Sequence, residues 1–320
     1  MEYRTVAGNR VSALCLGAML FGTRVDEDTS FAILDRYVEA GGTFVDTSNN
    51  YAFWLDGATG DESETTLGRW LARTGARDDV VIGTKVGARP RTPGDRTLDD
   101  VEGLSRAAIE AAIAQSLRRL GTDHVDVYYP HVEDRSVPLG ETLETLGGLV
   151  RSGAVGTLGV SNHALWRLER ARALSRSSGL PLYAFLQYRY SYLQPRFDVA
   201  LPASAHVHVG AELLDYLRSE DDTALVAYSP LLEGSYVRAD RPLPYAYDHP
   251  GTAARLDALA AVGKRTGATA NQVVLAWMLS RPEPIIPLVG VSSLGQLDEA
   301  IDAVDLELSP EDLAELDTAD

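Results

Sequence analysis

The sequence has little cysteine and no long apolar run. Its 320 residues include a single cysteine, Cys15, so no disulfide can form within the chain, which predicts a reducing, cytoplasmic environment. No run approaches the roughly 18 consecutive apolar residues that span a bilayer. The N-terminus carries Glu2 and lacks the long apolar region of a secretory signal. We therefore expect no membrane partner and no export.

Positive charge is also scarce. The chain has 29 Lys and Arg residues against 46 Asp and Glu residues, a formal net charge of −17. A surface of that sign repels a phosphate backbone, so nucleic acid is not expected as a partner. The acidic residues are scattered rather than gathered in one tail, which is typical of a solvated surface.

The motifs of metal-dependent and acyl-transfer enzymes are missing. There is no H-E-x-x-H, and the pair His206 and His208 has no companion cysteine or carboxylate cluster at ligand spacing. There is no G-x-S-x-G either, and Cys15 lies inside an apolar run. We therefore expect no metal site and no acyl-transfer nucleophile, which leaves proton-transfer chemistry to be considered.

Short apolar runs alternate with segments of helical periodicity. The strand candidates are residues 12–17, 43–46, 80–85, 125–130, 155–160, 183–188, 224–230 and 285–290. The helix candidates are residues 28–40, 63–74, 104–120, 139–152, 164–177, 209–219, 253–266, 269–280 and 293–303, with an extra terminal helix at 309–317. Strand-then-helix units with nearly continuous apolar strands predict a parallel sheet covered by helices.

Eight such units favour a single (β/α)8 TIM barrel over residues 1–320. A doubly wound open sheet is the alternative, and it usually has a Gly-rich turn after its first strand, which LGAMLFG is not. The connections after the sixth and seventh strands, residues 191–208 and 238–251, are unusually long. Long loops in compact domains are often lids or binding loops, so we expect these two to border the active face.

Polar residues follow three successive predicted strands. Asp46 ends the second, Lys85 ends the third, and His131 comes directly after the fourth. The carboxyl ends of barrel strands meet at one mouth, so these side chains are expected to converge there. Tyr51 follows Asp46 closely enough to fold back over the same mouth.

The chemistry suggested by this set is controlled proton donation. A free phenol has a pKa of about 10, and a neighbouring ammonium lowers it, so Lys85 is expected to lower the pKa of Tyr51. A desolvated lysine needs a carboxylate to remain charged, and Asp46 is placed to supply one. Tyr51 then becomes a usable general acid, while His131 hydrogen-bonds and orients a substrate oxygen.

Each of these residues also has an ordinary structural interpretation. Asp46 could cap a loop, Lys85 could be a solvated strand end, and Tyr51 and His131 could simply pack. Each structural interpretation is plausible for one residue considered alone. Their coincidence at successive strand ends favours the catalytic hypothesis.

With this tetrad, the segments GVSN (159–162), QYRYS (187–191) and YSPL (228–231) make the sequence similar to the aldo-keto reductases over nearly its whole length. The resemblance implies a barrel that binds a nicotinamide cofactor and reduces a carbonyl by hydride transfer. It also implies that Ser161, Asn162 and Gln187 bind the carboxamide and that Tyr228 stacks on the nicotinamide ring. The remaining expected cofactor contacts are Ser229, Leu231 and Gly234 along the pyrophosphate, and Gly290, Ser292, Gln296 and Glu299 at the adenosine end.

The adenosine segment departs from the family pattern. Many relatives have Arg or Lys beside the serine and Asn after the glutamate, where this chain has Ser293 and Ala300. A 2'-phosphate is usually held by a cation, and none lies nearby in the sequence. The resemblance implies NADPH, and the missing cation leaves NADH open.

The expected substrate is a carbonyl on a small or medium organic molecule, either sugar-derived or polyketide-like. Aromatic residues that could line its pocket are Phe53, Trp54, Tyr129 and Tyr190, with Leu55 and Tyr192 beside them. Their alternative role is loop packing. Two other functions remain open: a non-catalytic cofactor-binding sensor or regulatory subunit of the same fold, and a barrel lyase or isomerase without a nucleotide.

Overall fold

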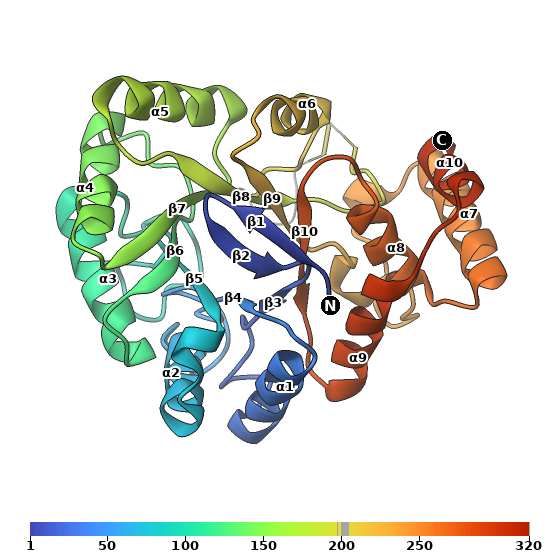
Figure 1. Ribbon diagram of the computed structural model, residues 1–320, viewed down its shortest axis with the longest axis horizontal. Helices are drawn as coiled ribbons and strands as arrows, with labels where there is room; N and C mark the ends of the chain where they lie inside the picture. Colours follow the sequence, from blue (N-terminus) through green and yellow to red (C-terminus); the bar gives the residue numbers. More distant parts are fainter. Residues whose placement is uncertain (197, 200–204, 320) are drawn as a thin grey trace.

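Eight parallel strands close into a barrel in the computed structural model, which describes residues 1–196, 198–199 and 205–319 (Figure 1). Each strand pairs with the next along the chain, and the last pairs with the first. The barrel strands are β3 (Cys15–Gly17), β4 (Phe44–Asp46), β5 (Val81–Val86), β6 (Val125–Pro130), β7 (Val155–Ser161), β8 (Tyr183–Arg189), β9 (Ala224–Tyr228) and β10 (Ile285–Gly290). The predicted (β/α)8 barrel is confirmed.

Helices surround this barrel, and every predicted helix is present within a few residues of its expected bounds. They are α1 (Glu27–Glu39), α2 (Glu62–Thr74), α3 (Arg106–Leu120), α4 (Leu139–Arg151), α5 (Leu165–Ser178), α6 (Ala211–Ser219), α7 (Pro250–Thr266), α8 (Ala270–Leu279), α9 (Leu294–Asp302) and α10 (Pro310–Thr318). Arg36 of α1 bonds Asp298 of α9 at 2.9 Å, which joins the first helix to the last helix of the ring. The helices α7 and α10 pack together outside the ring (Figure 1).

The helix boundaries follow from local chemistry. The Ser105 hydroxyl accepts from the Ala108 amide at the start of α3, and Gly121 ends that helix in the left-handed region with φ 66°. At α10, Ser309 and Asp312 form a capping box with Pro310 in the first turn. Capping side chains, a left-handed glycine and a first-turn proline thus account for these helix ends.

An N-terminal hairpin was not predicted. Its strands, β1 (Tyr3–Val6) and β2 (Asn9–Ser12), pair antiparallel around a turn in which Ala7 has φ 46° and Gly8 has φ 84°. The first predicted strand, 12–17, merged the end of β2 with β3. Asn9 Nδ2 donates to Thr157 Oγ1 near the start of β7 at 2.8 Å, so the hairpin crosses the end of the barrel where the strands begin (Figure 1).

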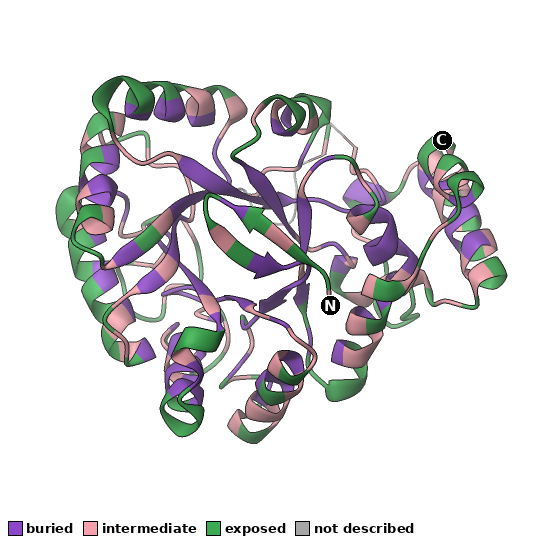
Figure 2. Ribbon diagram, in the orientation of Figure 1, coloured by how far each residue is buried: buried purple, intermediate pink, exposed green. Residues whose placement is uncertain are grey.

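Apolar side chains fill the barrel and separate it from the helices. The barrel strands are accordingly mostly buried, whereas the helices expose their outer faces (Figure 2). Inside the barrel, Tyr129 of β6 lies so close to Gly159 of β7 that a Cβ added at the glycine would be 2.2 Å from the ring. The interior cluster consists of Val6, Val11, Cys15, Phe44, Val127, Tyr129, Ala184, Phe185, Ala224, Val226 and Ile286. The barrel is therefore a packed core and not a channel, and chemistry is confined to its mouth.

Long connections follow β8 and β9, as predicted. Residues 197 and 200–204 of the first lie outside the described residues. Its last part returns along β8, where Arg189 N donates to Val207 O at 3.1 Å and Val209 N to Arg189 O at 2.9 Å. The second connection contains two 3-10 turns, Leu232–Gly234 and Tyr245–Tyr247.

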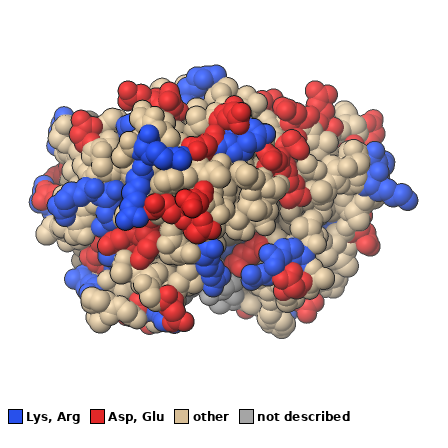
Figure 3. Space-filling model, turned by 90° about the horizontal axis from the view of Figure 1, so that it is seen from below, with Lys and Arg blue, Asp and Glu red and all other residues tan. Residues whose placement is uncertain are grey.

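On one face of the surface, acidic and basic side chains are interspersed (Figure 3). None of the described helices is both long and apolar enough to cross a bilayer. The cytoplasmic location stays a prediction.

Candidate active site

The carboxyl ends of three neighbouring strands bring the predicted tetrad together. Asp46 is the last residue of β4, Lys85 lies one residue before the end of β5, and His131 directly follows β6. The chain turns back after Asp46, so that Tyr51 reaches the same mouth. Parallel strands in register present their last side chains on one rim, which is why residues so distant in the sequence meet here.

Lys85, Tyr51 and Asp46 form a closed triangle of hydrogen bonds. Lys85 Nζ donates to Tyr51 OH at 2.6 Å, to Asp46 Oδ2 at 2.7 Å and to the Thr47 carbonyl at 2.7 Å. Tyr51 OH in turn donates to Asp46 Oδ2 at 2.7 Å. Lys85 and Asp46 are fully buried, and Tyr51 is 9% exposed. One ammonium, one carboxylate and one phenol therefore share a nearly dry site.

The electrostatics of the triangle differ from the expectation in one respect. Burial, followed by the Asp46 carboxylate, raises the pKa of Tyr51 well above its usual value, so the expected net lowering by Lys85 is wrong for this arrangement. Burial also lowers the pKa of Lys85, and Asp46 opposes that shift, as expected. The pKa of Tyr51 rises first because burial disfavours the charged phenolate, and second because Asp46 contacts the phenol directly and favours its protonated form. The tyrosine thus retains its proton at neutral pH.

His131 lies beside the triangle, with its ring nearly perpendicular to that of Tyr51. The Tyr51 and His131 ring centroids are 6.0 Å apart at an interplanar angle of 78°. Burial, followed by the Lys85 ammonium and His206, lowers the pKa of His131 well below its usual value, so the imidazole is neutral near pH 7. Its Nδ1 lies 3.3 Å from Ser48 Oγ, whose proton is also within reach of Asn50 Oδ1 at 2.7 Å. For Nε2 to donate to a substrate oxygen, the neutral ring has to carry its hydrogen on Nε2, which leaves Nδ1 as an acceptor facing the Ser48 hydroxyl.

The segment between Asp46 and Tyr51 is held by residues that the sequence interpretation missed. Asn49 Nδ2 donates to Glu102 Oε1 at 2.8 Å, and Asn50 Nδ2 donates to the Ala88 carbonyl at 2.8 Å. Thr47, whose carbonyl accepts from Lys85, also pairs through its hydroxyl with Ser63 Oγ at 2.7 Å. The available signal was the run TSNN itself, because four small polar residues directly after a buried strand need buried partners.

The three residues expected to bind a carboxamide lie together next to the triangle. Gln187 Nε2 donates to Asp46 Oδ1 at 2.8 Å, while its Oε1 makes no hydrogen bond with any described residue. Ser161 Oγ donates to the Gln187 carbonyl at 2.9 Å. Asn162 Nδ2 donates to the His131 carbonyl at 3.2 Å and to Ser161 Oγ at 3.0 Å. The set therefore braces β6, β7 and β8 around Asp46.

The end of β9 carries the residues expected along the nicotinamide ring and the pyrophosphate. Tyr228 is partly buried, and its hydroxyl donates to Asn162 Oδ1 at 2.7 Å. Ser229, Leu231 and Gly234 follow in a tight turn. Ser229 has φ 54° and Gly234 has φ 91°; the serine is a non-glycine residue in a conformation that costs about 1 kcal/mol or more. In the closed barrel β9 lies across from β5, the strand that carries Lys85.

The residues expected at the adenosine end surround the start of α9. Ser292 N and Ser292 Oγ both donate to Gln296 Oε1, at 2.8 and 3.1 Å, and Gly290 ends β10 beside them. Ser293 caps α9. Glu299 accepts from Thr269 Oγ1 at 2.6 Å and from Asn271 Nδ2 at 3.2 Å. No described Lys or Arg bonds Ser292, Ser293 or Gln296, which agrees with the missing cation in the sequence.

The predicted pocket aromatics divide into two groups. Phe53 and Trp54 form an edge-to-face pair with centroids 5.3 Å apart in the loop after Tyr51, and Trp54 is 37% exposed. Tyr129 instead fills the barrel interior, and Tyr190 is buried and stacks on Trp277 of α8 at 5.9 Å. Tyr192 packs edge-on against the same Trp277. The structure thus places the last three in the core, since their rings meet the barrel and the outer helices.

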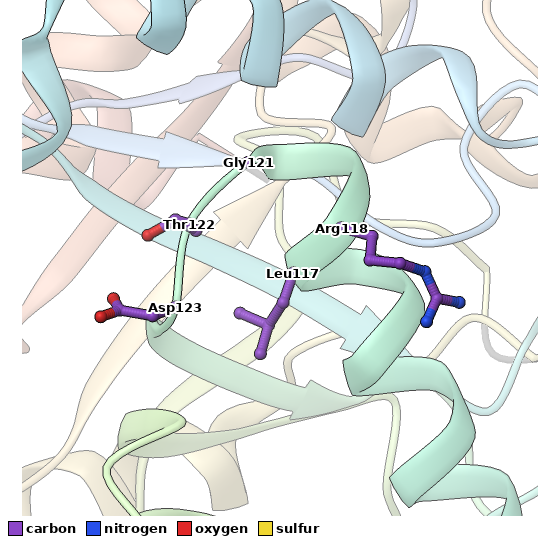
Figure 4. Close-up of a pocket in the computed structure, with 5 residues that line it drawn as sticks. All are labelled: Leu117, Arg118, Gly121, Thr122 and Asp123. Atoms are coloured by element: carbon purple, nitrogen blue, oxygen red, sulfur yellow. The ribbon is translucent and has the colours of Figure 1, made fainter.

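A surface hollow lies away from all of these residues. It sits at the end of α3, where the chain enters β6, and is lined by Leu117, Arg118, Gly121, Thr122 and Asp123 (Figure 4). This is the end of the barrel where the strands begin, whereas the tetrad lies where they end.

Comparison with known proteins gives consistent results. A family model described as the aldo/keto reductase family matches residues 13–320. Norsolorinic acid reductase stcV from Emericella nidulans is 32% identical over 98% of this chain and 79% of its own length. The uncharacterized oxidoreductase YrpG from Bacillus subtilis is 33% identical over 97% of this chain and 93% of its own length. An aryl-alcohol dehydrogenase from Pestalotiopsis microspora is 29% identical over 97% of this chain and 79% of its own length.

Proposed function

The chain is an oxidoreductase of the aldo/keto reductase family, and from that premise we propose that it reduces an aldehyde or ketone to an alcohol with a nicotinamide cofactor, on one barrel formed by residues 1–320. Tyr51 is the general acid in this proposal. The observation that carries it is the triangle of Lys85, Tyr51 and Asp46, with every side between 2.6 and 2.7 Å.

The residues at the mouth fit a nicotinamide dinucleotide. Gln187 Oε1 is an acceptor without a partner among the described residues, which suits the amide hydrogens of a carboxamide. Asn271 Oδ1 is buried beside Glu299 and has no partner in the part of the chain that the structure describes, which suits an amino group at the adenosine end. With Tyr228 between them in the chain, these groups support binding by Ser161, Asn162, Gln187, Tyr228, Ser229, Leu231, Gly234, Gly290, Ser292, Gln296 and Glu299.

The bound nicotinamide would supply the hydride. Tyr51 supplies the proton: its O–H turns from Asp46 to the substrate oxygen, so carbonyl, hydride and proton together give the alcohol. Lys85 remains within 2.6 Å of the phenol oxygen and stabilises the negative charge that develops there. Asp46 keeps Lys85 charged, and His131 donates from Nε2 to orient the carbonyl.

The substrate we propose is an aromatic or polyketide-like carbonyl compound. The aromatic pair Phe53 and Trp54 is separated from Tyr51 by one residue and offers apolar faces in the loop after it. One relative is named an aryl-alcohol dehydrogenase, which supports the aromatic part of this range. A sugar-derived carbonyl is the alternative, because a tryptophan face also packs against sugar rings.

The test is consumption of NADPH or NADH with aromatic aldehydes, aromatic ketones and aldoses, with the alcohol identified by mass spectrometry. We expect turnover of aromatic carbonyls in preference to aldoses. Tight cofactor binding without turnover of any carbonyl would instead indicate the sensor or regulatory function. A folded protein that binds neither nucleotide would contradict the reductase proposal and favour a cofactor-free barrel enzyme.

A further inference from the structure

Arg189, the last residue of β8, is a buried cation without an acidic partner. Its side chain is only 4% exposed, and it donates from Nη1 to Ser229 Oγ at 3.2 Å and from Nε to Tyr247 OH at 3.3 Å. Among the described residues, no carboxylate lies within ion-pair distance of it. A guanidinium removed from water without a counter-charge is costly, so this position calls for an explanation.

Arg172 of α5 shows how this fold accommodates a buried arginine for structural purposes. Its guanidinium is fully buried and pairs with Glu220 at 2.9 Å and with Asp222 at 2.5 Å. Both carboxylates come from the connection after α6, so the charge is neutralised within the chain. In a protein with 46 acidic residues, the lack of any acid at Arg189 is notable because acids are plentiful elsewhere.

The groups around Arg189 have hydrogens to donate. Ser229 Oγ and Tyr247 OH both accept from Arg189, and neither donates to another described residue, so both hydroxyl protons are available. Two buried imidazole nitrogens nearby, His206 Nδ1 and His208 Nε2, also have no hydrogen-bond partner among the described residues. Burial and the charge of Arg189 lower the pKa of each of these histidines to about 4, so Arg189 carries the positive charge of the cluster at neutral pH.

The cluster adjoins the candidate active site. Tyr228 precedes Ser229, its ring centroid lies 5.4 Å from that of His206, and its hydroxyl bonds Asn162, which bonds the His131 carbonyl. Tyr228 and Ser229 are partly exposed, whereas Arg189 and Tyr247 are buried behind them. A small molecule at the barrel mouth can therefore present a charged group at Ser229.

We propose that Arg189, Ser229 and Tyr247 form a binding site for an oxyanion, a phosphate or carboxylate carried by a small molecule at the barrel mouth. A guanidinium with two hydroxyl donors matches the acceptor-only chemistry of such a group. Two sources share this chemistry: the diphosphate of a dinucleotide cofactor and an acidic group on the carbonyl substrate. Assigning the source rests on the proposed function, while the oxyanion site itself does not.

The first experiment uses thermal unfolding with inorganic diphosphate as the probe and sodium chloride at equal ionic strength as the reference. We expect diphosphate to raise the Tm of the wild type and of Arg196→Met, and not that of Arg189→Met. Arg196 is the matched control because it also lies in the connection after β8 but is paired with Asp198 at 2.6 Å. An equal rise in Arg189→Met, or no rise in the wild type, would overturn the proposal.

The same melts test for a merely structural role. Without diphosphate, Arg189→Met is expected to unfold at the wild-type temperature or above, since the substitution removes an uncompensated buried charge. The contrary outcome has two parts: a clear fall in the Tm of Arg189→Met that Arg189→Lys does not restore, and a diphosphate effect that is retained. Together they would mean that Arg189 supports the fold through Ser229 and Tyr247 and binds no anion.

Calorimetry then separates the two sources. If the anion is the cofactor's diphosphate, Arg189→Met weakens both NADH and NADPH about tenfold or more, with partial recovery in Arg189→Lys. If it is a substrate acid, nucleotide affinity is unchanged and the KM for 4-carboxybenzaldehyde rises while that for benzaldehyde does not. Either result supports the site. If Arg189→Met changes neither the nucleotide affinity nor the KM for 4-carboxybenzaldehyde, the proposal is overturned. A wild type that binds diphosphate through Arg189 and binds no nucleotide would leave the site standing and refute the proposed reductase instead.

Discussion

Gln187 of β8 donates from Nε2 to Asp46 Oδ1 of β4 at 2.8 Å, a bond across the barrel mouth between residues 141 positions apart. Asp46 is fully buried, and its other carboxylate oxygen accepts from Lys85 and Tyr51. Gln187 thus completes the set of donors that holds the carboxylate in place. The proposed carboxamide contact would use the remaining oxygen of the same side chain.

Replacement of Gln187 is expected to destabilise the protein. Gln187→Met leaves Asp46 Oδ1 buried without a donor, which should lower the free energy of unfolding by about 1–3 kcal/mol. Gln187→Glu should be worse at neutral pH, because it places a second carboxylate against Asp46 in a dry site. Urea unfolding of both variants checks this order. Equal stability of the wild type and Gln187→Met would mean that the Gln187–Asp46 hydrogen bond does not stabilise the protein.

Lys85 is expected to control the pH dependence of reduction. Lys85→Met removes the ammonium that stabilises the developing phenolate, so kcat should fall by about a hundredfold or more. The phenol left behind is governed by burial and Asp46, which raise its pKa, so the alkaline limb of the kcat profile should move to higher pH. Only one other lysine exists in the chain, the exposed Lys264 of α7, and Lys264→Met is the matched control. An alkaline limb that stays in place would show that Lys85 does not act on Tyr51.

A cation introduced at Ser293 is expected to select for the 2'-phosphate. Ser293 is exposed at the N-terminus of α9, where the side chain caps Gln296 N, and no described Lys or Arg bonds it. Ser293→Arg should strengthen NADPH binding about tenfold relative to NADH. Ser293→Ala loses the same cap without adding charge and should leave the ratio unchanged, as measured by calorimetry. An equal change in the NADPH-to-NADH affinity ratio in both variants would mean that the 2'-phosphate does not bind beside Ser293.

Acid is expected to destabilise the fold through its buried histidines. Burial lowers the pKa of His163 to about 4, and the pKa values of His206 and His208 also fall to about 4. A lowered folded-state pKa means that the unfolded chain binds protons first, so stability is complete above about pH 6.5 and is lost as the pH falls towards 4. Each such histidine should remove about 1.4 kcal/mol per pH unit within that window. In urea titrations, His163→Gln should lose part of this slope, and an unchanged slope would contradict the assignment.

The meeting of the tetrad could be predicted because it depends on topology. Once eight strands alternate with helices, the carboxyl ends of β4, β5 and β6 have to share a rim, and the sequence alone places Asp46, Lys85 and His131 at or directly beside those ends. The pKa of Tyr51 could not be predicted in the same way. It depends first on how deeply the phenol is buried and then on whether the phenol contacts the carboxylate as well as the ammonium, and the sequence gives neither.

The aromatic residues show what the periodicity of the sequence cannot predict. Alternation along a strand says which residues face away from each other, but in a barrel one face meets the interior and the other meets the helices, and both are apolar. Tyr129 therefore looked like a pocket residue although it fills the barrel, and Tyr190 although it stacks on Trp277. The β1–β2 hairpin was missed because its turn is Ala7–Gly8, which lacks the Asn-Gly or Asp-Gly signature.

The central claim is that Tyr51 donates the proton. The most direct measurement compares kcat and cofactor affinity for Tyr51→Phe and Tyr128→Phe, with reduction followed by nucleotide absorbance and affinity by calorimetry. Tyr128 is a matched control, since it is a buried tyrosine whose hydroxyl bonds no residue that the structure describes. We predict a loss of about a hundredfold or more in kcat for Tyr51→Phe, with nucleotide affinity within about twofold of wild type and Tyr128→Phe unchanged in both. Near-normal turnover by Tyr51→Phe would contradict the account.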